Sequence, residues 1–146
     1  MNIMVEKLEK VFGMNNEFLC NIEEVDLKLR IDGIRSNTIA SQIACVAGGR
    51  DSYAKCILED EPFSWRPDFS YDDRYEYDKL INHLGNRSSS LIAALKSIKN
   101  FSLNQESLII DLISHEYLHQ GQIIRYFYAN ELEMPNSVKS FWHLED

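Results

Sequence analysis

The stretch QESLIIDLISHEYLHQGQIIRYFYANE, residues 105–131, has the hydrophobic pattern of a long helix. Apolar residues recur at three- and four-residue intervals along it, at Leu108, Ile109, Leu112, Ile113, Ile123 and Phe127. That spacing places them on one face of an α-helix. Pro135 follows and stops the helix from extending further. The stretch therefore predicts an amphipathic helix whose apolar face packs against other helices.

Three further segments carry a similar pattern. The first runs to about Leu19, the second follows a capping residue at Asn37 or Thr38, and the third extends from Tyr77 to Ile98. Residues 25–31 alternate as in a strand, but no partner strand is evident, so we expect an irregular connector with one helical turn. Four long helices without a sheet predict an all-α fold, and residues 1–146 suit a single domain.

A long connection, Glu59–Asp73, separates the second and third predicted helices. Short links place helices antiparallel, whereas a long one permits parallel neighbours, so we predict an up-down-down-up four-helix bundle. The connection contains Trp65, Phe69 and Tyr71. These aromatic side chains either cover a substrate pocket between helices or serve to anchor the loop or a dimer contact.

The overall charge excludes several classes of partner. The chain has 23 acidic and 15 basic residues, a net charge of −8, and no basic block. This argues against nucleic acid or an anionic membrane as the main partner. We expect a cytoplasmic protein, because no apolar run is long enough to span a bilayer and the N-terminus lacks the pattern of a signal peptide. Three cysteines without a Cys-x-x-Cys pair predict neither a disulfide framework nor a zinc knuckle.

His115 and His119 are four residues apart and share one face of the predicted helix. That spacing suits two imidazole ligands on one metal ion, although two ordinary helix histidines are the alternative. With Glu116 they match the His-Glu-x-x-His signature of zinc peptidases, in which the glutamate activates a water molecule. The metzincin extension of that signature is absent, and no strand is available to line a peptidase cleft.

Glu116 and Arg50 each fall near the middle of the apolar arc of their helix. Charged groups are rarely buried unless they are paired. We therefore predict that the two side chains meet in the core, or that each finds another polar partner there. In the same helix as Arg50, the pair Gly48-Gly49 weakens helix stability but lets a neighbouring segment approach closely.

The C-terminal third resembles the DinB-like superfamily of four-helix-bundle proteins, whose members carry His-x-x-x-His-x-Gly-Gln on the last long helix. Here those residues are His115, His119, Gly121 and Gln122. The stretch SNTIASQIACVAGGRDSY, residues 36–53, resembles the second helix of the family, and the long connection after it also fits. The resemblance implies a homodimer and a divalent metal held by three histidines, the first of them on the second helix.

This chain has Cys45 where the family has its first histidine. A cysteine thiolate binds zinc well, so Cys45, His115 and His119 are the predicted ligands, with zinc preferred to nickel. A site that has lost its metal, with Cys45 as a small buried residue, is the alternative. Gln42, Gln122 and Tyr126 are expected to line the substrate pocket.

Three functional hypotheses follow. The resemblance implies a metal-dependent enzyme that joins a small-molecule thiol to an electrophile, as bacillithiol S-transferases do. The second hypothesis is a bundle with a degenerate site that acts as a non-catalytic binding or stress-related module. The third is a small zinc peptidase that uses Glu116.

Overall fold

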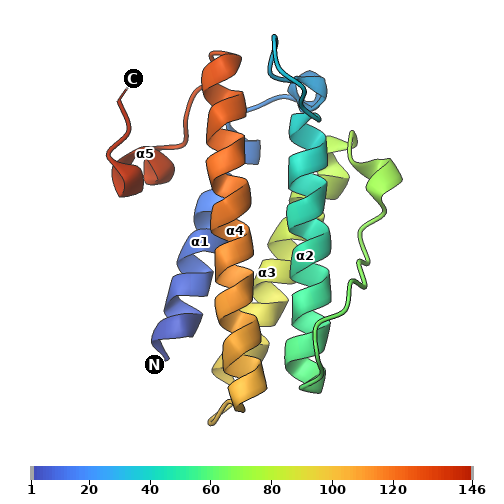
Figure 1. Ribbon diagram of the computed structural model, residues 1–146, viewed down its shortest axis with the longest axis vertical. Helices are drawn as coiled ribbons and strands as arrows, with labels where there is room; N and C mark the ends of the chain where they lie inside the picture. The colour runs from blue at the N-terminus through green and yellow to red at the C-terminus, as the bar shows by residue number, and fades with distance from the viewer. Residues whose placement is uncertain (1, 146) are drawn as a thin grey trace.

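The computed structural model describes residues 2–145, so Met1 and Asp146, the ends of the predicted domain, lie outside the described residues. The long helices are α1 (Ile3–Cys20), α2 (Ile39–Glu59), α3 (Tyr77–Lys96) and α4 (Leu103–Ala129), shown in Figure 1. The short elements are η1 (Glu24–Lys28), η2 (Tyr71–Asp73) and α5 (Asn136–Trp142). No strand occurs among these residues, which confirms the all-α prediction. Within residues 2–145, no helix combines the length and the hydrophobicity that a membrane span requires.

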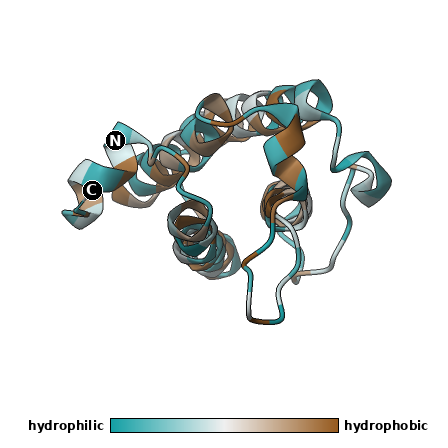
Figure 2. Ribbon diagram, turned by 90° about the horizontal axis from the view of Figure 1, so that it is seen from above, coloured by the Kyte–Doolittle hydropathy of each residue, from teal (hydrophilic) through white to brown (hydrophobic). Residues whose placement is uncertain are grey.

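The long helices pack around a shared apolar core. Both α3 and α4 pack against α1 and α2. Seen from above in Figure 2, the four helices surround a common centre. The chain after α2 returns along the outside of that helix, so that α3 begins near the end of the molecule where α2 began (Figure 1). Large side chains with almost no exposure fill the centre, among them Leu8, Phe12, Phe18, Ile57, Leu84, Leu91 and Phe127.

The helix starts are fixed by side-chain caps. Thr38 caps α2, because its hydroxyl accepts a hydrogen bond from the amide of Ser41 at 3.2 Å. A reciprocal pair of 3.0 Å bonds between Ser102 and Gln105 caps α4. The predicted start of α4 at Gln105 was therefore two residues late. Leu103 is 85% exposed and lies outside the apolar face, so periodicity does not detect this first turn.

The long connection is anchored by the buried carboxylate of Asp51 on α2. It accepts hydrogen bonds from the backbone amides of Asp68 and Phe69 at 2.8 and 2.9 Å, and it also binds His83 and Arg87 of α3. Burial by itself would raise the pKa of Asp51, but these hydrogen bonds outweigh it and lower the pKa to about 2. Asp51 thus holds the connection against both helices.

The C-terminal segment docks on α4. The indole nitrogen of Trp142 donates to Gln120 at 2.6 Å, and the ring of Phe141 stacks on Tyr117 with a centroid separation of 6.0 Å. The segment forms helix α5, which the sequence did not predict. Its seven residues are too few to show a helical period.

Candidate metal centre

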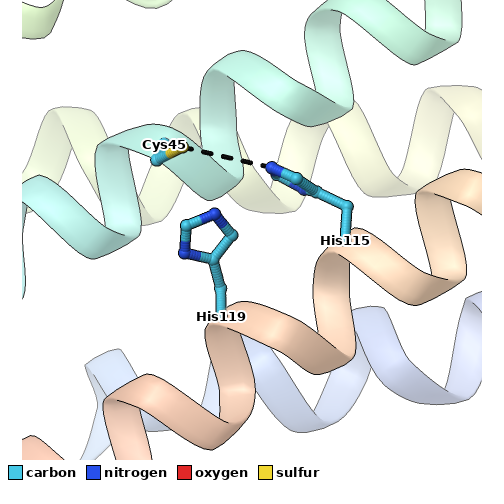
Figure 3. Close-up of side chains that lie close together, drawn as sticks. All are labelled: Cys45, His115 and His119. Carbon is cyan, nitrogen blue, oxygen red and sulfur yellow. Dashed lines mark hydrogen bonds between the residues drawn. The ribbon is translucent and has the colours of Figure 1, made fainter.

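Cys45, His115 and His119 come together although 70 positions separate the cysteine from the first histidine. Cys45 lies on α2 and both histidines lie on α4, and Figure 3 shows the three side chains directed toward one another between these helices. The sulfur of Cys45 is 4.0 Å from Nε2 of His115, and one ligand atom from each residue lies within 4.8 Å of the others. The structure therefore brings together the three residues that were predicted as ligands.

Gly49 makes room for the imidazole of His115. A Cβ atom at position 49 would lie 2.3 Å from Cε1 and 2.8 Å from Nδ1 of that ring, which is closer than packed atoms can approach. Its neighbour Gly48 does the same for Trp65, since a Cβ there would lie 2.7 Å from the indole. The glycine pair that weakens α2 thus lets His115 approach one side of its backbone and the long connection approach another.

A chain of hydrogen bonds orients His119. Its Nδ1 lies 2.8 Å from the side-chain oxygen of Gln42, whose amide nitrogen donates to Asn37 at 3.1 Å. The hydroxyl of Tyr126 donates to the same oxygen of Asn37. Because Gln42 accepts the bond, Nδ1 of His119 carries the proton and Nε2 keeps its lone pair for a metal ion. The sequence predicted Asn37 only as a possible helix cap and gave no sign of this supporting role.

The imidazoles are held in the neutral form that binds metal. Burial lowers the pKa of His115. Burial also lowers the pKa of His119 to about 4, aided by the nearby His115 and opposed by Glu116 and Gln122. Burial raises the pKa of the Cys45 thiol. Nδ1 of His115 is buried and has no hydrogen-bond partner among the described residues. At neutral pH the cluster therefore carries little charge before a cation binds.

The donor set fits a divalent metal ion. Zinc binds thiolates at about 2.3 Å and imidazoles at about 2.0 Å, so the ligand atoms of a tetrahedral site lie about 3.5 Å apart. The ligand atoms here all lie within 4.8 Å of one another, which is close to that spacing. One sulfur and two imidazole nitrogens suit zinc, and they also suit nickel. Cys45, His115 and His119 can therefore hold one such ion with three protein ligands.

Glu116, which lies next to His115 in sequence, belongs to the core. Its carboxylate accepts two hydrogen bonds from the guanidinium of Arg50, at 2.7 and 3.0 Å, and one from Asn15 at 2.7 Å. The side chains of Arg50 and Glu116 are both fully buried. The predicted contact between them is confirmed. Both carboxylate oxygens are occupied, so Glu116 is not placed to activate a water molecule at the histidines.

Two cavities lie near this centre, one lined by Cys45 and the other by Gln42, which contacts His119. The smaller, of about 250 Å³, is lined by Cys45 and by the aromatic side chains of the long connection, Trp65, Phe69 and Tyr71. The larger, of about 660 Å³, lies between the end of α4 and the loop before α2, and its lining includes Gln42, Gln122 and Tyr126. The three predicted substrate-binding residues therefore share one cavity, and the loop aromatics line the other.

No family model matches this chain, and no curated protein matches it either. The similarity to the DinB-like superfamily thus consists of the residues quoted above, chiefly His115, His119, Gly121 and Gln122. Any assignment of function depends on the geometry of the site.

Proposed function

We propose that the chain is a metal-dependent enzyme of the DinB-like type, in which an up-down-down-up four-helix bundle holds a divalent ion, zinc in preference to nickel. Its proposed reaction transfers a low-molecular-weight thiol, of the bacillithiol type, to an electrophile. The observation that carries this proposal is the convergence of Cys45, His115 and His119 from two helices. The space provided by Gly49 and the orientation of His119 by Gln42 support it.

The chemistry follows from the number of ligands. Three protein ligands leave one position open, which is the arrangement of catalytic rather than structural zinc sites. Cys45, His115 and His119 would hold the ion, and a bound divalent ion would supply a Lewis acid that lowers the pKa of a small thiol, so that the nucleophilic thiolate would be present at neutral pH. The thiol proton then passes to solvent. The sulfur forms a bond to the electrophilic carbon, and the leaving group departs with the electron pair of the broken bond.

Peptide hydrolysis is not favoured by the same geometry. A zinc peptidase needs a carboxylate beside the metal that accepts a proton from water. The corresponding residue, Glu116, is fully buried and binds Arg50 and Asn15. Its role is therefore to stabilise the fold.

Metal content and thiol conjugation test the proposal together. The purified protein should contain about one ion per chain and should conjugate bacillithiol, glutathione or cysteine to chlorodinitrobenzene. His119→Ala should lose metal and activity at once. His143→Ala, at an exposed histidine of the C-terminal segment, should keep both. A wild-type protein that binds no metal and conjugates nothing would favour the non-catalytic bundle instead.

The role of Cys45 needs its own comparison. Cys45→Ala should reduce metal content, whereas Cys20→Ala, at an exposed cysteine, should not. Cys45→His restores the three-histidine set that the resemblance implies and should restore metal binding. Unchanged metal content in Cys45→Ala would show that the third ligand is not this sulfur.

We also propose that the chain forms a homodimer. Exposed apolar side chains, including Ile110 and Leu118 on α4 and Trp65 in the long connection, have surface that a second copy would remove from water. Light scattering at micromolar concentration should then give twice the mass of the chain. A stable monomer would contradict this proposal.

A further inference from the structure

The larger cavity carries a charge opposite to that of the protein. The chain as a whole has a net charge of −8. The residues that line this cavity include Arg35 and Arg125, and no aspartate or glutamate is among them. A cationic cavity in an acidic protein concentrates small anions, because the local field outweighs the distant charges at physiological ionic strength.

Arg35 and Arg125 also lack partners. Among residues 2–145, neither guanidinium donates a hydrogen bond or joins an ion pair. Every other arginine does so, as the bonds of Arg30, Arg50, Arg66, Arg74 and Arg87 show. A guanidinium presents a planar set of donors that matches a carboxylate. The two arginines that no protein acceptor uses therefore both border the same cavity, 90 positions apart in the chain (125 − 35).

This cavity adjoins the candidate metal centre. Gln42 lines it and also holds Nδ1 of His119 at 2.8 Å. Gln122 lines it and lies close enough to interact with the same imidazole. A small molecule with one end at Cys45, His115 and His119 therefore has its other end in reach of the cavity that Arg35 and Arg125 border.

We propose that this cavity binds the carboxylate end of an acidic small-molecule thiol, with Arg35 and Arg125 pairing with its carboxylates. The sulfur is directed to the metal centre. The smaller cavity, bordered by Trp65, Phe69 and Tyr71 beside Cys45, then takes an apolar electrophile. This inference deepens the proposed function by naming the chemistry of its substrates. It rests on that function for the role of the sulfur, whereas recognition of the acid does not require a metal.

Succinate, a dicarboxylate without sulfur, tests the acid site alone. Binding is measured by calorimetry on the full chain after removal of metal with a chelator. We expect succinate to bind and succinamide not to. Arg35→Gln and Arg125→Gln should each weaken succinate binding about tenfold, since each removes a charge-assisted pair. Lys7→Gln removes the same charge from an exposed position on α1 and should change nothing. Equal binding by the wild type and the double arginine variant, or no binding by the wild type, overturns the proposal.

A second experiment separates this inference from the proposed function. The metal-loaded chain is assayed with chlorodinitrobenzene and either mercaptosuccinate or its diamide. Each arginine variant should lower kcat/KM about tenfold for the acid and leave the diamide unaffected. An equal loss for both thiols would show that the arginines do not recognise the carboxylates. If succinate binds through both arginines but no thiol is conjugated, the proposed transferase function is wrong and the acid-binding cavity stands.

Discussion

Two polar clusters share helix α4 and differ in how completely their hydrogen-bonding groups are satisfied. In the core, both oxygens of Glu116 are bonded, and the guanidinium of Arg50 has several acceptors. At the metal centre, Nδ1 of His115 has no partner among the described residues, and Cys45 lies 4.0 Å from the same ring. Burying a polar group without a partner costs stability. The contrast is that the first cluster is fully satisfied within the fold, whereas the second has polar atoms without protein partners and could hold a metal ion.

The core cluster also reaches further through the molecule. Arg50 of α2 donates to Asn16 of α1 at 2.7 Å and to the carbonyl of Leu84 in α3 at 3.2 Å. Asn15 links Glu116 to Gln120, which in turn accepts the bond from Trp142. One buried network thus touches each long helix and α5. Such a network opposes sliding of one helix against another, because a shift would leave several groups unpaired.

The largest effect is expected from breaking the core pair. Glu116→Gln or Arg50→Met should each cost on the order of 3 kcal/mol of unfolding free energy, because the remaining charge stays buried without its partner. The double variant should lose much less unfolding free energy than the two single variants added together. Denaturant unfolding measures all three. The exposed pair Lys96–Glu9 is the control, with an expected effect below about 1 kcal/mol. Additive effects of the Arg50 and Glu116 substitutions would rule out coupling.

Substitution of a metal-centre histidine should weaken metal binding and leave stability largely unchanged. We expect His119→Ala to weaken zinc binding by at least about a hundredfold, as loss of a ligand does, while the metal-free protein stays folded. Competition with a chromophoric chelator measures the affinity, and unfolding of the chelator-treated protein measures the stability. If the loss of stability matches that of Glu116→Gln, His119 belongs to the core network instead.

Asp51 and its partners form a third polar cluster, which should contribute to stability as the Arg50–Glu116 pair does. Its folded pKa of about 2 lies below the ordinary 3.8, so ionised Asp51 contributes stability above pH 3.8 that is lost as the pH falls toward 2. The shift corresponds to about 2 kcal/mol. The stability difference between the wild type and Asp51→Asn should therefore narrow by about that amount across this window. Unfolding free energies measured as a function of pH test this, and a constant difference would contradict it.

A smaller effect is expected at Gln42, which supports the metal centre without being a ligand. Gln42→Leu removes the acceptor that orients His119 and should weaken zinc binding about tenfold with little change in stability. Gln42→Glu keeps an oxygen acceptor and should retain affinity. Identical zinc affinity in the wild type and Gln42→Leu would show that the orientation of His119 does not depend on this bond.

The residues that the sequence predicted well are those on regular helices. Helical periodicity locates the long helices, and the angle between successive residues places Arg50 and Glu116 in the apolar arcs, where burial demands a partner. His115 and His119 share a face for the same reason. Cys45 required the family resemblance, because no local pattern relates it to residues on another helix.

The features that the sequence did not predict lie in segments without regular hydrophobic periodicity or depend on side-chain contacts. Arg35 and Asn37 lie in the irregular loop before α2, so their approach to α4 follows from the tertiary structure alone. The early start of α4 was detectable in principle, since Ser102 and Gln105 have the spacing of a capping box. The bonding of Gln42 to His119 depends on side-chain rotamers, which helical spacing does not define.

The space at Gly49 has a consequence for recognising related chains. The pattern His-x-x-x-His occurs by chance in many helices and says little by itself. A chain that keeps both histidines but has any larger residue at the position of Gly49 has no room for the first imidazole in this arrangement. Glycine four residues after Cys45 is therefore a diagnostic position, which distinguishes a chain able to assemble this centre from one that retains only its histidines.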